Sequence, residues 1–331
     1  MVIDVHHHFM PETLLDYIRT KGEKLDTEII VVDGLEYVFH KTEGFRFPLQ
    51  KAFYDAKTRI ADMDNMGINK AVLSLVPSSF FYYLEDLKEA LNLSRLCNNW
   101  VAAECKRYPE KFIAMASLPM QDLELSLGEL ERANKELGIK GIIIAPVILG
   151  SMLDDKKFFP IYEYCEKNGV LIFLHPYFPG KKPEYAGYYN VNLVGNVFDT
   201  NVGINHMIFG GVFEQFPRLN IFASHGGGYF PYQFGRLMHG YKVRTEPKAN
   251  IPISPDKYLK NIHYDTITHG VPALQFLADA FGADSVMVGT DYPFDMGDYE
   301  PVQKVNALRL THSERESILH TNAERFFETS C

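Results

Sequence analysis

Three consecutive histidines, His6, His7 and His8, occur in the segment VIDVHHHFMP at residues 2–11. The apolar residues before them predict a short buried strand, and Pro11 should end it because proline has no amide proton for a sheet. Side chains alternate across a strand, so His6 and His8 should point to one side and His7 to the other. Two imidazoles on one face can bind a single divalent metal. We therefore interpret the segment as part of a metal site rather than as the remnant of an affinity tag.

Three more potential ligands, His175, His225 and Asp291, each follow a later apolar segment that predicts a strand. If these strands are parallel, their carboxyl ends meet on one face together with His6 and His8. A single histidine after a strand is usually a hydrogen-bonded structural residue, but five such groups at equivalent strand ends favour a metal site. Histidine and carboxylate ligands suit zinc, manganese or iron.

The segments that must position these groups alternate between strand-like and helical patterns. Helical crossovers between buried strands predict a parallel sheet. Eight such units favour a (β/α)8 TIM barrel, with residues 1–331 forming one domain. A doubly wound open sheet is the alternative, but it normally has a glycine-rich phosphate-binding turn after its first strand, where this chain has histidines. The predicted strands are residues 2–10, 71–76, 112–118, 141–145, 170–174, 220–224, 262–266 and 285–289. The predicted helices are residues 12–21, 55–66, 84–108, 123–137, 159–168, most of 190–216, 228–241, 271–281 and the C-terminal helices of 299–331.

Residues 25–50 interrupt the alternation directly after the first predicted strand and helix. Two apolar runs in this stretch flank the turn Asp33-Gly34, which predicts an inserted β-hairpin. Arg46 and Lys51 near its end are candidate substrate-binding residues at a pocket mouth. Ordinary solvated loop charges are an equally good interpretation of both.

Composition sets the broad class of the protein. The chain has 331 residues, of which 46% are hydrophobic and 23% charged, as in globular domains with a large core. The net charge of -9 argues against a nucleic-acid partner. The sequence shows no signal-peptide pattern, and no apolar run approaches the ~18 residues of a membrane helix. None of the four cysteines forms a C-x-x-C pair, which favours a reduced, cytoplasmic protein.

The segment after the sixth predicted strand has a different character. Three glycines follow His225 and would let the backbone approach a ligand closely. The next predicted helix begins there and would favour an anion at its N-terminus. Arg236, farther along this helix, could hold a carboxylate with two hydrogen bonds, although an arginine paired with a local acid on the surface is as good an interpretation. His239 and His269 are secondary candidates for a pocket.

These motifs resemble the amidohydrolase superfamily, in particular its decarboxylase branch. The resemblance is carried by IDVHHH at residues 3–8, LHP at 174–176, MIFGGVFEQFP at 207–217, HGGGYFPYQFGRLMHGY at 225–241 and VGTDYPF at 288–294. It implies a divalent metal, usually zinc with manganese as the alternative, and no organic cofactor. It implies that the metal ligands are His6, His8, His175 and Asp291. It also implies that His225, with Asp291, carries out acid–base catalysis, and that Arg236 binds the substrate carboxylate across the interface of a homodimer.

The implied activity is a metal-dependent decarboxylase that releases CO2 from a small unsaturated or aromatic carboxylic acid resembling aminocarboxymuconate semialdehyde. Enzymes that act on this compound carry a second arginine before the first barrel helix, where the present sequence has Gln50 and Lys51, with Arg46 nearby. Two alternatives stay open. One is a metal-dependent hydrolase or hydratase of a ring-cleavage-type dicarboxylate, and the other is an inert barrel that binds a metal or ligand. In each case the expected partner is a small anionic carboxylate, not a nucleic acid or a membrane.

Overall fold

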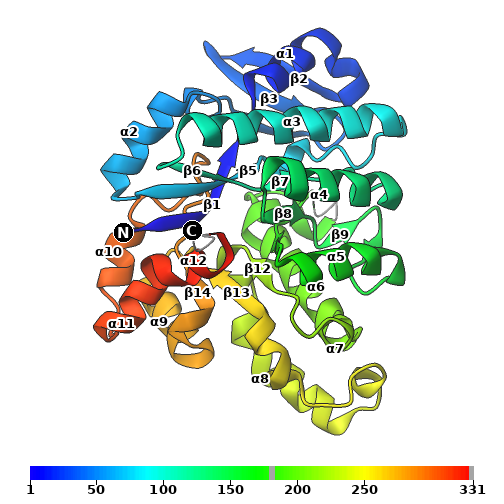
Figure 1. The fold of residues 1–331 in the computed structure, drawn as a ribbon, viewed down its shortest axis with the longest axis vertical. Coiled ribbons are helices and arrows are strands. Elements are labelled where there is room, and N and C mark those ends of the chain that lie inside the picture. Colours follow the sequence, from blue (N-terminus) through cyan, green and yellow to red (C-terminus); the bar gives the residue numbers. More distant parts are fainter. Residues whose placement is uncertain (179–182, 328–331) are drawn as a thin grey trace.

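The computed structural model describes residues 1–178 and 183–327, which form an α/β fold around parallel strands (Figure 1). Each of the eight segments predicted to form a strand overlaps at least one of these strands. The parallel strands are β1 (Ile3–Phe9), β5 (Lys70–Leu75), β6 (Phe112–Ala114), β7 (Ala116–Ser117), β8 (Gly141–Ile144), β11 (Leu171–Leu174), β12 (Ile221–Ala223), β13 (Ile262–Asp265) and β14 (Val286–Met287). They lie in two sheets, with the orders β1-β5-β6 and β14-β13-β12-β11-β8-β7.

Contacts beyond the regular ladders bring the two sheets together. Only Met115 separates β6 from β7 along the chain, so one continuous segment contributes a strand to each sheet. At the opposite ends of the sheets, the amide of Val5 in β1 donates to the carbonyl oxygen of Val288, just after β14, at 2.8 Å. The amide of Asp291 also donates to the carbonyl of His6 at 2.8 Å. The first and last parallel strands therefore lie side by side.

Helices connect the strands, and their ends follow local sequence signals. Asp55, Asp86 and Asp122 accept hydrogen bonds from backbone amides in the first turns of α2, α3 and α4. Gly67 and Gly138 end α2 and α4 in the left-handed conformation. The helices are α1 (Glu12–Lys21), α2 (Ala56–Met66), α3 (Leu87–Arg107), α4 (Leu123–Leu137), α5 (Phe159–Asn168), α6 (Val197–Phe209), α7 (Val212–Gln215), α8 (Phe230–Val243), α9 (Val271–Phe281), α10 (Pro301–Asn306), α11 (His312–Glu316) and α12 (Asn322–Phe327), with π-helices at Val191–Asn196 and Ser317–Thr321.

The predicted insertion is larger than a hairpin. It forms a three-stranded antiparallel sheet of β2 (Thr27–Val32), β3 (Leu35–His40) and β4 (Phe45–Pro48) in that order. The third strand forms because Gly44, with a φ of 63°, helps reverse the chain after β3, and Phe47 then turns into the core. The insertion lies beside α1 at one end of the molecule, opposite the end where α8 projects (Figure 1). A second antiparallel pair, β9 (Val147–Ile148) and β10 (Ser151–Met152), follows β8.

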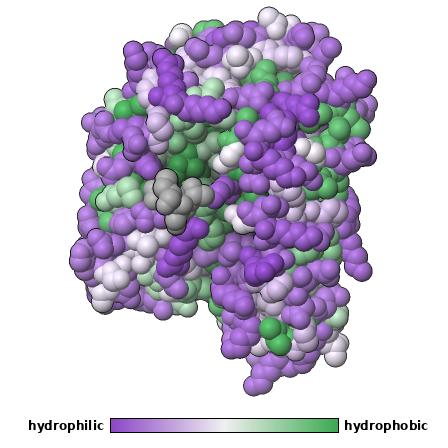
Figure 2. All heavy atoms as spheres, in the orientation of Figure 1, coloured by the Kyte–Doolittle hydropathy of each residue, from purple (hydrophilic) through white to green (hydrophobic). Residues whose placement is uncertain are grey.

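Buried apolar side chains from the insertion, the parallel strands and the helices form one hydrophobic cluster. The surface in the view of Figure 2 is mostly hydrophilic, with hydrophobic side chains gathered in a hollowed area. No helix in residues 1–178 and 183–327 is both long and apolar enough to cross a membrane. The C-terminal helices predicted for residues 299–331 are α10 to α12, and residues 328–331 lie outside the described residues. That residues 1–331 form one domain stays a prediction.

Candidate metal centre

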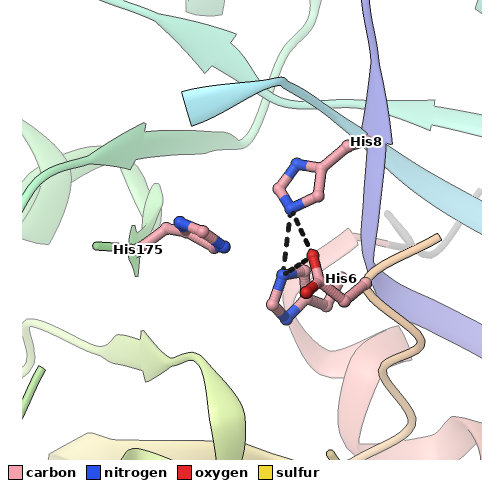
Figure 3. Close-up of side chains that lie close together, drawn as sticks. His6, His8 and His175 are labelled. Atoms are coloured by element: carbon pink, nitrogen blue, oxygen red, sulfur yellow. Dashed lines mark hydrogen bonds and ion pairs between the residues drawn. The ribbon is translucent and has the colours of Figure 1, made fainter. Parts of the chain in front are cut away.

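The first strand presents two histidines to one side, as the alternation of side chains predicts. All seven residues of β1 are buried, so its histidines are shielded from bulk water. The Nε2 atoms of His6 and His8 lie 3.0 Å apart and face each other (Figure 3). His7 turns the other way, and its Nδ1 atom lies 2.8 Å from Oδ2 of Asp4.

Two later strand ends add His175 and Asp291 to this pair. Oδ1 of Asp291 lies 3.2 Å from Nε2 of His6 and 3.1 Å from Nε2 of His8. His175 extends toward the same space from the end of β11 (Figure 3). One ligand atom from each of the four residues lies within 4.8 Å of the other three. The structure therefore brings together the four ligands that the resemblance implies.

The hydrogen bonds behind these residues fit a metal. The Nδ1 atoms of His6 and His175 donate to Oδ2 of Asp265, at 2.7 Å, and to the carbonyl oxygen of Pro176, at 2.9 Å. Each Nε2 atom is therefore left with a lone pair that faces the centre. Within the described residues, the buried Nε2 of His175 has no hydrogen-bond partner. Lone pairs and a carboxylate that converge in this way match the donor set of zinc or manganese.

The electrostatics also call for a cation at the centre. Burial disfavours the charged form of His6, but the carboxylates of Asp291 and Asp265 outweigh this effect and raise its pKa to about 9. Burial lowers the pKa of His8 and, to a greater extent, that of His175. Burial opposes ionisation of Asp291, but the nearby charge of His6 and hydrogen bonds from the histidines hold its pKa well below the usual range. A bound divalent metal would supply the charge that His6 otherwise takes up as a proton.

His225 lies beside the four ligands. Its Nε2 atom is 3.5 Å from Oδ2 of Asp291, and its ring centroid is 5.2 Å from that of His175. Its side chain is 14% exposed, whereas His6 and His8 are fully buried. His225 can therefore reach both the centre and the adjoining cavities, as an acid–base group requires.

The sequence analysis missed Asp265, which links the ligands to His225. Its carboxylate is fully buried and accepts hydrogen bonds from Nδ1 of His6 and from the backbone amides of His225, Gly226 and Ile267. It is the last residue of β13. Its place at a strand end is therefore a signal in the sequence that it belongs to the site, although this signal does not give its role.

Arg59 is a second supporting residue that the sequence analysis did not identify. Its guanidinium donates to the carbonyl oxygens of His8, Ala52 and Phe53 at 2.7, 2.9 and 2.9 Å. The residue is 1% exposed, and burial lowers the pKa of its guanidinium to about 10. Arg59 therefore fixes the backbone of β1 at the point where His8 leaves it.

Two cavities meet at the metal centre. The first, which we call the α9 cavity, has a volume of about 650 Å³ and lies among α8, α9 and the loop after β13. The second, the aromatic cavity, has a volume of about 360 Å³. Aromatic side chains make up much of its wall: Phe45, Tyr177, Phe178, Tyr185, Tyr188, Tyr189 and Phe294. His225 and Asp291 line both cavities, so a ligand in either one can reach the centre.

The predicted substrate-binding residues lie elsewhere on this chain. Arg236 is exposed on α8. The guanidinium of Arg46 packs 5.2 Å from the ring centroid of Tyr37, and Nζ of Lys51 lies 3.7 Å from Oδ2 of Asp55. The described residues that line the two cavities include no lysine and no arginine. The binding roles of the three cations stay predictions.

His239 and His269, the secondary candidates for a pocket, differ in whether they line a cavity. His239 is exposed on α8 and is not among the described residues that line either cavity. His269, in contrast, lines the α9 cavity.

The aromatic residues at 80–83 mainly pack in the interior, since three of them are buried.

Comparisons with known proteins show the family of this chain and similar folds. A family model described as amidohydrolase matches residues 3–329. The chain is 38% identical over 275 residues to a 2-amino-3-carboxymuconate-6-semialdehyde decarboxylase of Dictyostelium discoideum, covering 82% of this chain and 76% of the relative. It is 30% identical over 291 residues to a gamma-resorcylate decarboxylase of Rhizobium radiobacter, covering 82% and 86%. Its fold is similar to that of a 5-carboxyvanillate decarboxylase of Novosphingobium aromaticivorans complexed with manganese and 4-hydroxy-3-methoxy-5-nitrobenzoic acid. The TM-score is 0.83, the identity 26%, and the coverage 99% of this chain and 96% of that chain.

Proposed function

The chain belongs to the amidohydrolase family, and from this premise we propose that it is a metal-dependent decarboxylase of small aromatic or unsaturated carboxylic acids. The observation that carries the proposal is the cluster of His6, His8, His175 and Asp291, with His225 beside it, where the two cavities meet. We further propose that the fold is a closed (β/α)8 barrel. The hydrogen bonds between β1 and the segment at β14 support this architecture.

His6, His8, His175 and Asp291 would hold a divalent metal, zinc or alternatively manganese, which would supply a Lewis acid to stabilise negative charge on the substrate. The protein supplies the proton transfer. When the C–CO2 bond breaks, its electron pair stays on the substrate carbon, which must then gain a proton. His225 can deliver that proton from Nε2, while Asp265 holds its backbone in place.

The aromatic cavity supports an aromatic or conjugated substrate. Rings pack well against the rings of Tyr177 and Phe294, and the apolar wall excludes water from the breaking bond. Because no lysine or arginine among the described residues lines the cavities, a cation from elsewhere would improve binding of an anion. We propose that Arg236 of a second copy supplies this cation in a homodimer.

We also propose a cytoplasmic location, which the free thiols of Cys97, Cys105 and Cys165 support.

The test combines metal analysis with a screen for CO2 release. Purified protein should contain about one zinc or manganese ion per chain, and it should release CO2 from at least one carboxylated aromatic or muconate-type acid. A chelator should abolish release, the metal should restore it, and His6→Ala should bind less metal and lose activity. A single product heavier than the substrate by one water would instead identify a hydratase, and two fragments whose masses sum to substrate plus water would identify a hydrolase. Stoichiometric metal without turnover across the panel would favour an inert binding barrel.

A further inference from the structure

Three residues in an unfavourable backbone conformation follow three neighbouring strands. His225, His269 and Asp291 have φ angles of 55°, 54° and 57°, and they come after β12, β13 and β14, which are adjacent in the sheet. Residues other than glycine seldom adopt positive φ, and the free-energy cost is tolerated most often at functional sites. All three residues line the α9 cavity. Two of them belong to the metal centre described above, and His269 has no role there.

The surroundings of His269 leave its imidazole available to a ligand. The residue is exposed, and within the described part of the chain its side chain makes no hydrogen bond or ion pair. The neighbouring Thr268 is engaged, because its hydroxyl donates to the carbonyl of Gly270 at 3.2 Å. The far wall of the cavity is apolar and includes Pro272 and Phe276. A polar group that enters this space from the metal centre would therefore find His269 as a free partner.

The charge of the cavity also points to His269. Among the described lining residues, the histidines and acids are His225, His269 and Asp291, and there is no lysine or arginine. In the proposed mechanism, Asp291 is a metal ligand, and His225 delivers a proton to the reacting carbon. Among the described lining residues, His269 is thus the remaining group that can donate to an anion and, when protonated, add positive charge. The side chains of Asn192 and Asn196, which line both cavities, offer only neutral hydrogen bonds.

We propose that His269 binds a second carboxylate of the substrate, distinct from the one released as CO2, and so makes the site selective for dicarboxylic over monocarboxylic acids. This inference rests on the proposed function, because it takes the metal centre as the place where the first carboxylate binds. Asp291 of that centre and His269 both line the α9 cavity, so the proposed substrate would occupy this cavity with one carboxylate at each of them.

The test measures binding without turnover. Metal-loaded protein is titrated by calorimetry with benzene-1,3-dicarboxylate and with benzoate, which share a ring and differ by one carboxylate. The wild-type protein should bind the dicarboxylate more tightly. His269→Gly, which accepts the same positive φ, should weaken dicarboxylate binding about tenfold and leave benzoate binding unchanged, because a hydrogen bond to a charged group is lost. His269→Asn, also tolerated at positive φ, should lose less dicarboxylate affinity than His269→Gly does, because the asparagine amide can still donate a hydrogen bond.

The matched control is His239→Gly, which removes an exposed histidine outside both cavities and should keep the wild-type affinities. Equal affinities of the wild-type protein for the two probes would overturn the inference. The inference would also be overturned if both His269 variants kept the wild-type ratio of dicarboxylate affinity to benzoate affinity. Absence of CO2 release from every acid tested, combined with dicarboxylate selectivity that depends on His269, would refute the proposed decarboxylation while supporting His269 as the group that binds the second carboxylate.

Discussion

Asp265 lies directly behind His6, with its Oδ2 atom 2.7 Å from Nδ1 of the imidazole, and both residues are fully buried. Such a carboxylate fixes the orientation and tautomer of a metal-binding histidine and makes it a better donor. Asp265→Asn should therefore lower metal affinity about 10- to 100-fold. Titration of the metal-free protein against a competing chelator measures this change.

Asp16→Asn is the control for that substitution, since Asp16 is exposed and its carboxylate makes a long ion pair of 3.5 Å with Arg19. It should leave metal affinity unchanged. If Asp265→Asn binds metal as tightly as the wild type does, the buried carboxylate does not tune the centre.

His225→Asn should keep the metal and lose most of the turnover. The residue lies 3.5 Å from Asp291 but outside the group of four ligands, so its loss should spare metal binding. Loss of a general acid–base group typically costs about 10²- to 10⁴-fold in rate. Metal content and kcat should be measured on the same preparation. A fully loaded variant with near-normal kcat would show that another group transfers the proton.

Arg236 provides a test of the proposed dimer. It is exposed on α8 and is not among the described residues that line the cavities of its own chain. If it serves the pocket of the partner subunit, inactive His225→Asn and inactive Arg236→Ala chains should regain activity when mixed, because one of the two hybrid pockets contains both groups. Chains that have demonstrably exchanged and yet stay inactive would place Arg236 in its own pocket or outside catalysis. Mixing each variant with itself is the control.

Arg59→Met should destabilise the protein strongly. The substitution removes the donor that the carbonyl oxygens of His8, Ala52 and Phe53 share and leaves these acceptors buried. Unsatisfied buried acceptors cost about 1–3 kcal/mol each, and we expect a total loss of about 3 kcal/mol in the free energy of unfolding by urea. The exposed Arg19→Met, which breaks only surface ion pairs, should cost less than about 1 kcal/mol. Similar losses for the two variants would argue against the role of Arg59.

His40 should make stability depend on pH. Burial between the insertion strands lowers its pKa from 6.5 to about 4. Between these values the unfolded chain binds a proton that the folded chain does not, so the free energy of unfolding falls as the pH drops from 6.5 toward 4. From pH 7 to pH 5, His40 should account for about 2 kcal/mol of that fall, at about 1.4 kcal/mol per unit.

The measurement for His40 compares urea unfolding of the wild type and His40→Gln at the two pH values. Contributions from other buried histidines and from metal loss are common to both proteins and cancel. If the free energy of unfolding falls by the same amount in both proteins, the folded and unfolded chains protonate His40 equally readily, and the prediction is wrong.

The sequence predicted the strand positions and the clustering of potential ligands well, and physical reasons explain this. Buried parallel strands are short apolar runs, and their carboxyl ends share one face, so the sequence alone predicts that His175 and Asp291 lie near His6. Asp265 lies at an equivalent strand end but was not identified, because sequence does not reveal whether a carboxylate faces a metal or the back of a ligand. Asp265 shows that supporting residues depend on side-chain direction.

The insertion and the substrate-binding residues were harder to predict. The turn Asp33-Gly34 specified β2 and β3, but β4 has only four residues and pairs with β3 through contacts that no local pattern encodes. Arg59 appeared as one polar residue of an amphipathic helix, although its guanidinium is buried among carbonyl groups. The partners of Arg46 and Lys51 depend on how the insertion folds, so their positions could not be inferred from the spacing of charges.

The adjacency of β1 and β14 has a consequence for biosynthesis. The hydrogen bond between Asp4 and Thr290 joins residues that are 286 positions apart in the chain. A ribosome that adds about 5–20 residues per second needs roughly 15–60 s between them. Throughout that interval His6 and His8 exist without Asp291, so the nascent protein has only part of its ligand set. The complete set of four ligands can therefore form only after the last parallel strand has been made.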